Sequence, residues 1–177
     1  MQIAVIEGDD AAPEAMKPSV ELLDTLNLYL DLGLDWAYPV VGEQAKLDHG
    51  TTFPEEAKKI IDASDTTYFG STSGSASKAL FYLRSGRQTF ANVRPCRYLE
   101  GARSPLVDPI TQPRNFDVVV MPNLYGDIMS DAAAGLMGGL GLAASGGYGK
   151  SYAYFEPAHG TAPDIRGKTL SPPPLRC

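Results

Sequence analysis

The chain has 177 residues, of which 44% are hydrophobic and 20% are charged, so it can bury a core of ordinary size and has the composition of a globular protein. Its formal net charge of -6 argues against a nucleic-acid partner, which requires a basic face, and means that an anion site must be built locally from Arg, Lys or a metal. The start, MQIAVIEGDD, is too short and too acidic for a signal peptide, and no apolar run is long enough to span a membrane.

The two cysteines, Cys96 and Cys177, do not have the spacing of metal ligands, and one of them is the last residue. We therefore expect both to be reduced thiols, as is usual inside cells. Together with the acidic start, this predicts a soluble cytoplasmic protein, or a protein of the mitochondrial matrix if the source is eukaryotic.

The first seventy residues predict alternating strands and helices. The apolar run QIAVIEG predicts a strand, and the stretch after Pro13 places apolar side chains at three- and four-residue spacings, as in an amphipathic helix. A second strand is expected in DWAYPVV, a second helix in TFPEEAKKIIDAS with Thr52 as its candidate N-cap, and a third strand in TTYFG. This rhythm is typical of an α/β fold with a parallel-dominated sheet flanked by helices.

The remainder of the chain is less regular. After the polar loop STSGSAS, the segment KALFYLRSGRQTFANVRP predicts a helix that runs into an extended piece, and the proline-containing residues 96–115 predict a linker or a splice between two units. FDVVVMP predicts a strand and LYGDIMSDAAAGLMGGLGL a helix rich in small residues. We expect the core strands near Ile3 to Ile6, Tyr68 to Gly70 and Asp117 to Met121.

Two carboxylates form the first candidate site. Asp127 and Asp131 are four residues apart, so in a helix they project from one face. Mg²⁺ and Mn²⁺ prefer oxygen ligands and keep several waters, so two stacked carboxylates suit them as a partial site. The alternative is that the two acids only complement the helix dipole, which stabilises a helix by about 0.3–1 kcal/mol.

A cationic pair and a small-residue loop form two further candidates. Arg84 and Arg94 flank the expected transition from helix to extended chain, and Arg forks bind carboxylates with two bonds; the alternative is a pair of surface ion pairs. In EPAHGTAPD, small residues around His159 allow a ligand to approach the backbone closely, although a lone His is most often structural. GGLGL follows a helix rather than a strand, so it is not a dinucleotide-binding turn.

Taken together, these stretches resemble a known family. FANVRP, FDVVVMPNLYGDIMSD and FEPAHGTAPDIRGK are similar to the β-decarboxylating dehydrogenases, which act on isocitrate, 3-isopropylmalate or homoisocitrate. IAVIEGDDAAPE resembles the opening of that family, and TFPEEAKKIIDASD resembles one of its helices. The resemblance covers nearly all of the chain from Met1 to Lys168.

The resemblance implies a chemistry and a set of sites. It implies oxidation of a 2-hydroxy acid by NAD or NADP followed by loss of a carboxylate, with Mg²⁺ or Mn²⁺ as Lewis acid. Asp127 and Asp131 match metal ligands of the family, and Arg84 and Arg94 match arginines that hold the substrate carboxylates. The family is homodimeric or hetero-oligomeric. The residues that match its cofactor site around adenosine are Glu156, His159, Gly160, Thr161, Ala162, Pro163 and Asp164.

The chain also departs from the family pattern. Its opening loop reads GDDAAPE instead of GDGIGPE, with Asp10 and Ala12 where glycines are expected. A long central segment of the family has no counterpart, since Pro109 is followed almost directly by RNFDVVV, and Pro172 stands where an adenine-contacting Asn is expected. That segment carries a third substrate arginine, the catalytic tyrosine and lysine, a further metal aspartate and the dimer clasp.

These departures predict a truncated isopropylmalate dehydrogenase-like fold. Residues 1–177 are expected to form a single shortened domain, with an N-terminal part (1–109) joined to a C-terminal part (114–168), no catalytic residue identified and apolar surface left exposed. The expected function is an impaired decarboxylating dehydrogenase; the alternative is a non-catalytic remnant or a ligand-binding or assembly subunit. ANVRPC and VMPNLYGDI favour the NAD-linked isocitrate type, whereas Leu80 favours the isopropylmalate type, so the substrate stays open.

Overall fold

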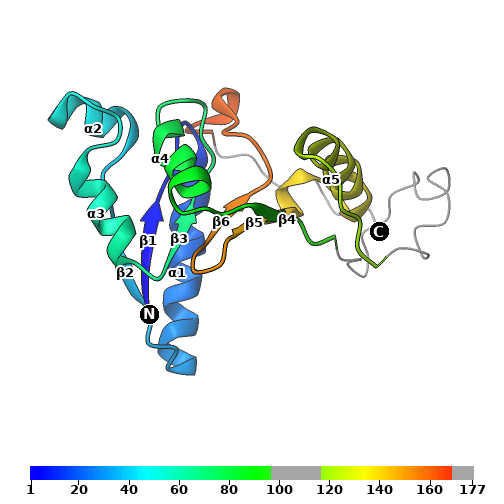
Figure 1. Cartoon of the computed structure of the whole chain (residues 1–177), viewed down its shortest axis with the longest axis horizontal. Helices are drawn as coiled ribbons and strands as arrows, with labels where there is room; N and C mark the ends of the chain where they lie inside the picture. The colour runs from blue at the N-terminus through cyan, green and yellow to red at the C-terminus, as the bar shows by residue number, and fades with distance from the viewer. Residues whose placement is uncertain (97–116, 169–177) are drawn as a thin grey trace.

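A six-stranded mixed sheet organises the chain (Figure 1). The structure, a computed structural model, describes residues 1–96 and 117–168. Neighbouring strands are parallel in the pairs β1–β2, β1–β3 and β3–β6, whereas β5 is antiparallel to both β6 and β4, so all strands except β5 point the same way. This confirms the prediction of an α/β fold with a parallel-dominated sheet. The strands, in the order in which they lie in the sheet, are β2 (Asp35–Ala37), β1 (Gln2–Ile6), β3 (Thr66–Phe69), β6 (Ala153–Pro157), β5 (Ala144–Tyr148) and β4 (Ala91–Val93).

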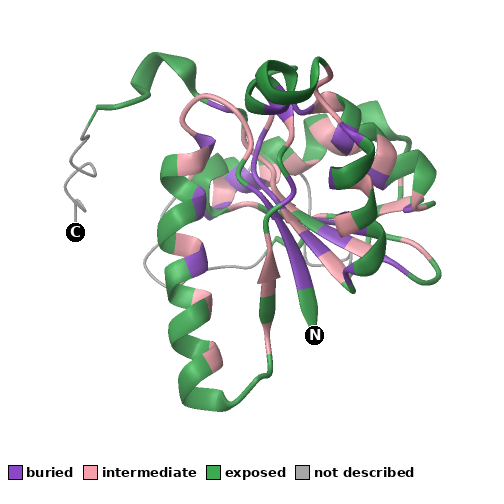
Figure 2. Ribbon diagram, turned by 90° about the vertical axis from the view of Figure 1, so that its left-hand side faces the viewer, coloured by how far each residue is buried: buried purple, intermediate pink, exposed green. Residues whose placement is uncertain are grey.

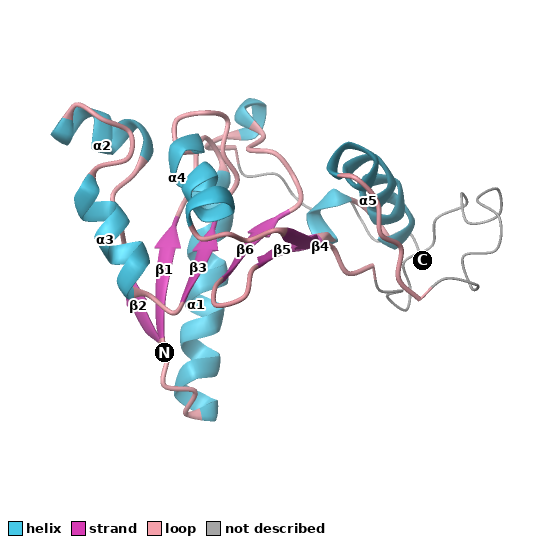
Figure 3. Ribbon diagram, viewed as in Figure 1, coloured by secondary structure: helices cyan, strands magenta, loops and turns pink. Residues whose placement is uncertain are grey.

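Helices cover both faces of the sheet, and one helix lies at its β4 end (Figure 3). α1 (Ala12–Leu30) lies on one face, while α3 (Glu55–Ala63), α4 (Ser77–Phe81) and the π-helix η1 (Tyr82–Gly86) lie on the other. α2 (Gly42–His49) precedes α3, α5 (Asn123–Met137) lies beside the β4 end, and η3 (Leu140–Leu142) and η4 (Pro163–Ile165) are short 3-10 turns. In the described part of the chain, no helix has the length and apolar character that a membrane crossing requires.

The core has two layers because successive side chains of a strand point to opposite faces. On β1, Ala4 and Ile6 face α3, α4 and η1, where they join a buried cluster with Phe69 and Tyr154. The alternate residues of β1, Ile3 and Val5, face α1 and form the second, smaller cluster with Met16 and Val20 of that helix. Figure 2 shows the buried residues gathered along the central strands and the inner side of the helices.

The α1 face of the sheet is only partly covered. Tyr68, which packs beside the α1 cluster, is paired in register with Phe155, and residues paired in this way lie on the same face. Phe155 is 39% exposed, and its ring contacts that of Tyr148 edge to face at 5.8 Å between centroids. The expected exposed apolar surface is therefore present on the β6–β5 half of this face.

The structure corrects two predictions about secondary structure. Asp117 to Met121 is not a strand: Val118, Val119 and Val120 are 80%, 60% and 91% exposed. An apolar run forms a buried strand only where a neighbouring strand pairs with it, and among the described residues none does so here. Thr52 is not the N-cap of α3, because Pro54 holds that position. The expected linker at 96–115 lies, apart from Cys96, outside the described residues.

Candidate functional site

The predicted site residues share one edge of the sheet. β1, β3, β6 and β4 point the same way, so the segments that follow them leave from the same edge, and α5 and η3 lead into β5 at that edge. Ligands of open α/β sheets bind outside the carboxyl ends of the strands. This topology therefore places the opening loop, the Arg84 and Arg94 region, α5 and the HGTAPD loop around a common edge.

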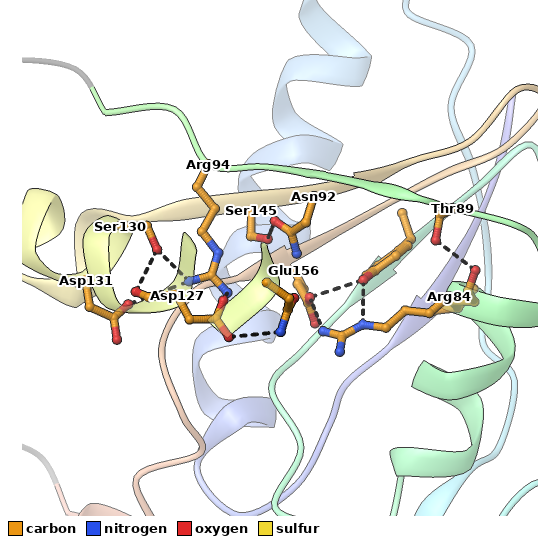
Figure 4. Close-up of polar contacts among 12 residues, drawn as sticks. Arg84, Thr89, Asn92, Arg94, Asp127, Ser130, Asp131, Ser145 and Glu156 are labelled. Atoms are coloured by element: carbon orange, nitrogen blue, oxygen red, sulfur yellow. Dashed lines mark hydrogen bonds and ion pairs between the residues drawn. The ribbon is translucent and has the colours of Figure 1, made fainter. Parts of the chain in front are cut away.

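Arg94 lies between the two predicted metal ligands (Figure 4). Its Nη2 is 2.8 Å from Asp127 Oδ1 and its Nη1 is 3.6 Å from Asp131 Oδ1. Nη1 also donates a hydrogen bond of 2.8 Å to the hydroxyl of Ser130, which sequence reasoning missed although it lies on the same helical face. The structure thus joins one predicted substrate residue to both predicted metal residues.

Arg84 forms the second cluster of the site. Its Nε donates to the Tyr154 hydroxyl at 3.0 Å, and its Nη2 lies 3.2 Å from Glu156 Oε1. Burial alone would lower the pKa of Arg84, but the contacts with Tyr154 and Glu156 outweigh it and raise that pKa. Glu156, predicted to contact the cofactor, therefore neutralises a predicted substrate arginine in this structure.

The π-helix η1 explains how Arg84 is positioned. Arg84 of η1 and Arg87, the residue directly after it, contact Tyr154 of β6 and Tyr152, the second residue upstream of Tyr154. Arg84 reaches the hydroxyl of Tyr154, and the guanidinium of Arg87 lies over the ring of Tyr152 at 4.0 Å. Arg87 is further held by Asp62 at 3.1 Å. The wide turn of a π-helix, which occurs often at functional sites, is thus held to β6 by Arg84 and to α3 by Tyr82 and Arg87, which both contact Asp62.

The two clusters are close neighbours on the sheet. Arg94 follows Val93, which pairs with Gly146, and Gly146 pairs with Phe155, the residue before Glu156. Arg94 and Glu156 therefore leave strands that are separated by β5 alone, which corresponds to a backbone separation of about 10 Å.

The HGTAPD loop is bound to the loops that follow β1 and β3. The Thr161 hydroxyl donates to Asp10 Oδ2 at 2.7 Å, the Ala11 amide donates to the Thr161 carbonyl at 3.1 Å, and the Ser71 hydroxyl donates to the Gly160 carbonyl at 3.2 Å. His159 Nδ1 lies 2.9 Å from the Gly160 carbonyl, and open space surrounds the Gly160 Cα where a side chain would stand. The predicted cofactor loop is thus fixed at its base and open at Gly160.

The two departures in the opening loop have a structural account. Asp10 has a φ of 55°, a conformation that glycine adopts freely and Asp tolerates better than most residues. The hydrogen bond from Thr161, together with one from Ser73, lowers the pKa of Asp10 and favours its charged form. Ala12 begins α1 and is 4% exposed, so its methyl group is accommodated in the core.

Asp9 is a structural centre of this edge that sequence reasoning missed. Its carboxylate accepts hydrogen bonds from the Thr72 hydroxyl, the Ser75 hydroxyl and the amides of Ser73 and Ala76. Burial alone would raise the pKa of Asp9, but these hydrogen bonds together lower it. The sequence did contain a signal for this role: Asp9 is a charged residue shortly after the parallel strand β1, and a serine-rich loop follows the parallel strand β3.

The contribution of Asp9 should depend on pH. Because its folded-state pKa lies below the ordinary value of 3.8, its stabilising contribution is fully present above about pH 4 and is lost as pH falls through the folded-state pKa. The difference in free energy of unfolding between the parent and Asp9→Asn should therefore shrink on acidification. Urea unfolding at a series of pH values measures it, with Asp35→Asn, an exposed aspartate of β2, as control. A difference that stays constant down to pH 3 contradicts the account.

The residues present fit a divalent cation as a partial site. Among the described residues, no three or more His, Cys, Asp or Glu side chains converge, so the protein ligands there are the two carboxylates of Asp127 and Asp131. The guanidinium of Arg94 already stands as a cation between them. Mg²⁺ commonly uses one or two carboxylates and keeps several waters, so this donor set is suitable.

Comparisons with known proteins agree on one family. The family model described as isocitrate/isopropylmalate dehydrogenase matches residues 2–110 and 104–174. The 3-isopropylmalate dehydrogenase of Methanothermobacter thermautotrophicus is 28% identical over 271 residues, spanning 98% of this chain and 81% of that protein. A probable mitochondrial NAD isocitrate dehydrogenase subunit alpha of Drosophila melanogaster is 61% identical over 64 residues, 36% of this chain and 17% of that protein.

A solved structure supports the fold. The isocitrate dehydrogenase of Methylococcus capsulatus superposes with a TM-score of 0.80 at 22% identity, covering 94% of this chain and 80% of that one. The alignment with the Methanothermobacter protein is 271 residues long, whereas this chain has 177, so that protein contains residues without a counterpart here.

Proposed function

Because the chain belongs to the isocitrate/isopropylmalate dehydrogenase family, we propose that it binds a 2-hydroxy acid of the isocitrate or 3-isopropylmalate type together with NAD or NADP and Mg²⁺ or Mn²⁺, for oxidative decarboxylation. The observation that carries this proposal is the Arg94 guanidinium between Asp127 and Asp131. It gathers an anion receptor and a pair of hard-cation ligands in one place, at the carboxyl edge of the sheet.

Each element of the site has a role in this proposal. Arg84 and Arg94 bind and orient the carboxylates of the acid, because guanidinium forks match carboxylates in geometry and charge. Asp127 and Asp131 hold the divalent cation, which when bound supplies Lewis-acid polarisation of the substrate oxygen. The loop from His159 to Asp164 forms the base of the cofactor site, with Gly160 leaving room for close approach.

A second candidate is binding without turnover. General acid–base catalysis requires a positioned proton donor and acceptor, and the tyrosine and lysine expected from the family have no counterpart in this sequence. The gapped alignment, and the match of the family model in two segments, 2–110 and 104–174, support this alternative. The chain then acts as a ligand-binding or assembly subunit, with hydroxy acid and cofactor as ligands.

Turnover and binding assays distinguish the two candidates. The first assay follows reduced nicotinamide with isocitrate or 3-isopropylmalate, NAD or NADP, and Mn²⁺; the second measures binding of each acid by calorimetry with Mn²⁺ present. Binding without turnover supports the subunit role, and turnover supports the enzyme. If neither acid binds, the proposed substrate class is wrong.

Removing the two aspartates should abolish cation binding. We expect the parent to bind Mn²⁺ with a Kd of about 1 mM, as suits a site with few protein ligands. Asp127→Asn with Asp131→Asn should show no specific binding, because neutral amide oxygens do not replace the charge of carboxylates. Electron paramagnetic resonance of free Mn²⁺ measures both, with Asp35→Asn plus Asp48→Asn as the matched control. Equal binding in the parent and the Asp127/Asp131 variant excludes the assignment.

A further inference from the structure

We propose that Arg94 closes the Asp127–Asp131 pair in the cation-free chain, and that a divalent cation on this pair releases Arg94 to become the receptor for an anion. This inference rests on the proposed function in assigning the cation to Asp127 and Asp131. It goes further in making Arg94 a residue with two alternative partners. Arg94 then opposes binding of the cation and requires the cation in order to bind an anion.

The first support is the geometry of the Arg94 fork. Both terminal nitrogens face internal partners: Nη2 lies 2.8 Å from Asp127, and Nη1 lies 2.8 Å from Ser130 and 3.6 Å from Asp131. A bidentate contact with an external carboxylate uses two nitrogens of the same fork. An incoming carboxylate therefore competes for Arg94 with Asp127 and Asp131, which α5 holds within ion-pair distance of the guanidinium.

The second support is the local charge. Arg94 with Asp127 and Asp131 carries a net charge of -1, and Arg84 is neutralised by Glu156, so the edge repels an anion. A divalent cation changes the charge of the Arg94 group from -1 to +1. Two like charges at ion-pair distance repel each other, so the same cation drives the guanidinium away from the carboxylates.

The third support is that the two carboxylates are accessible from solvent. The side chains of Asp127 and Asp131 are 46% and 51% exposed, so a hydrated cation reaches them from solvent. Arg94 is 19% exposed and extends from the end of β4, where Val93, Pro95 and Cys96 are exposed.

The two ligands must therefore assist each other. If the cation raises the affinity for the anion by some factor, the anion raises the affinity for the cation by the same factor. This coupling requires no direct contact between the ligands, because it passes through the change of partner at Arg94. It thus extends to anions that do not chelate the metal.

Removal of the guanidinium tests the first half of the inference. Arg94→Gln should bind Mn²⁺ about three- to tenfold more tightly than the parent, since the variant loses a competing cation held by two partly exposed ion pairs. Lys59→Gln, which removes one positive charge from the exposed side of α3, should bind Mn²⁺ as the parent does. Circular dichroism establishes that both variants are folded. Equal or weaker Mn²⁺ binding in Arg94→Gln overturns the inference.

Chemical modification of the unaltered protein tests the second half. Phenylglyoxal should modify Arg94 at least about threefold faster with saturating Mg²⁺ than without it, because a freed guanidinium is more accessible. Arg84 is the internal control: it stays with Tyr154 and Glu156, so its rate should not change. Peptide mass spectrometry gives both rates. If Mn²⁺ and Mg²⁺ bind but Arg94 is not modified faster, the inference fails while the cation site stands; if no cation binds to parent or variant, both fail.

Discussion

Phe69→Ala should lower the free energy of unfolding by about 3–5 kcal/mol, because it removes a large ring from a site that cannot collapse. Phe69 has no exposed surface and lies on the central strand β3, in the same buried cluster as Ile6, Leu83 and Tyr154. The helices of that face and the strands on both sides of β3 surround the space that the ring leaves. A cavity at this position therefore remains largely unfilled.

The chain provides a matched control for this substitution. Phe90 is 76% exposed, so Phe90→Ala makes the same chemical change without a cavity and should alter stability by less than about 0.5 kcal/mol. Urea unfolding followed by circular dichroism gives both values. Similar losses in the two variants contradict the assignment of Phe69 to the core.

Gly8→Ala should destabilise the protein by about 3 kcal/mol or more, the second large effect. Gly8 has a φ of +85°, and an added Cβ would lie 2.3 Å from the carbonyl oxygen of Ser71. The obstacle is backbone of the loop after β3, so it cannot rotate away as a side chain does. The two loops must separate, and the hydrogen bond from the Asp9 amide to the Ser71 carbonyl, now 2.9 Å long, is lost.

Gly50→Ala separates the two causes of this effect. Gly50 has a φ of +72°, but a Cβ there meets no atom within 4 Å. It therefore reports the conformational strain alone, about 1 kcal/mol for a non-glycine residue in the left-handed region. If Gly8→Ala lowers the free energy of unfolding no more than Gly50→Ala does, the loops after β1 and β3 do not approach each other as closely as the structure shows.

Periodicity predicted the elements that sequence patterns determine locally. The strands β1 and β3 and the helices α1, α3 and α5 follow from apolar spacing and flanking Gly or Pro. β5 did not, because its glycines are required by the strand that it pairs with: a Cβ on Gly147 would be 2.1 Å from the ring of Tyr154 on β6. A strand whose small residues make room for the side chains of its neighbour in the sheet lacks the apolar or alternating pattern from which a strand is predicted.

For the candidate site, too, the sequence predicted some features and not others. The types of residue were predictable, since Asp127 and Asp131 share a helical face and Arg84 and Arg94 match a family pattern. Their partners were not, because the ion pair between Arg94 and Asp127 joins the end of β4 to α5, and the pairing of Arg84 with Glu156 joins η1 to β6. Such pairs depend on strand order, which spacing along the chain does not contain.

The position of β6 in the sheet has a consequence for synthesis of the protein. β6 lies between β3 and β5, so the edge of β3 stays unpaired until residues 153–157 have left the ribosome, more than 80 residues after Phe69. At 5–20 residues per second that delay is about 4–17 s, during which the nascent three-stranded half of the sheet exposes a row of free amides and carbonyls. During that time the newly made chain is open to pairing of this edge with another chain, which is the principal hazard in its folding.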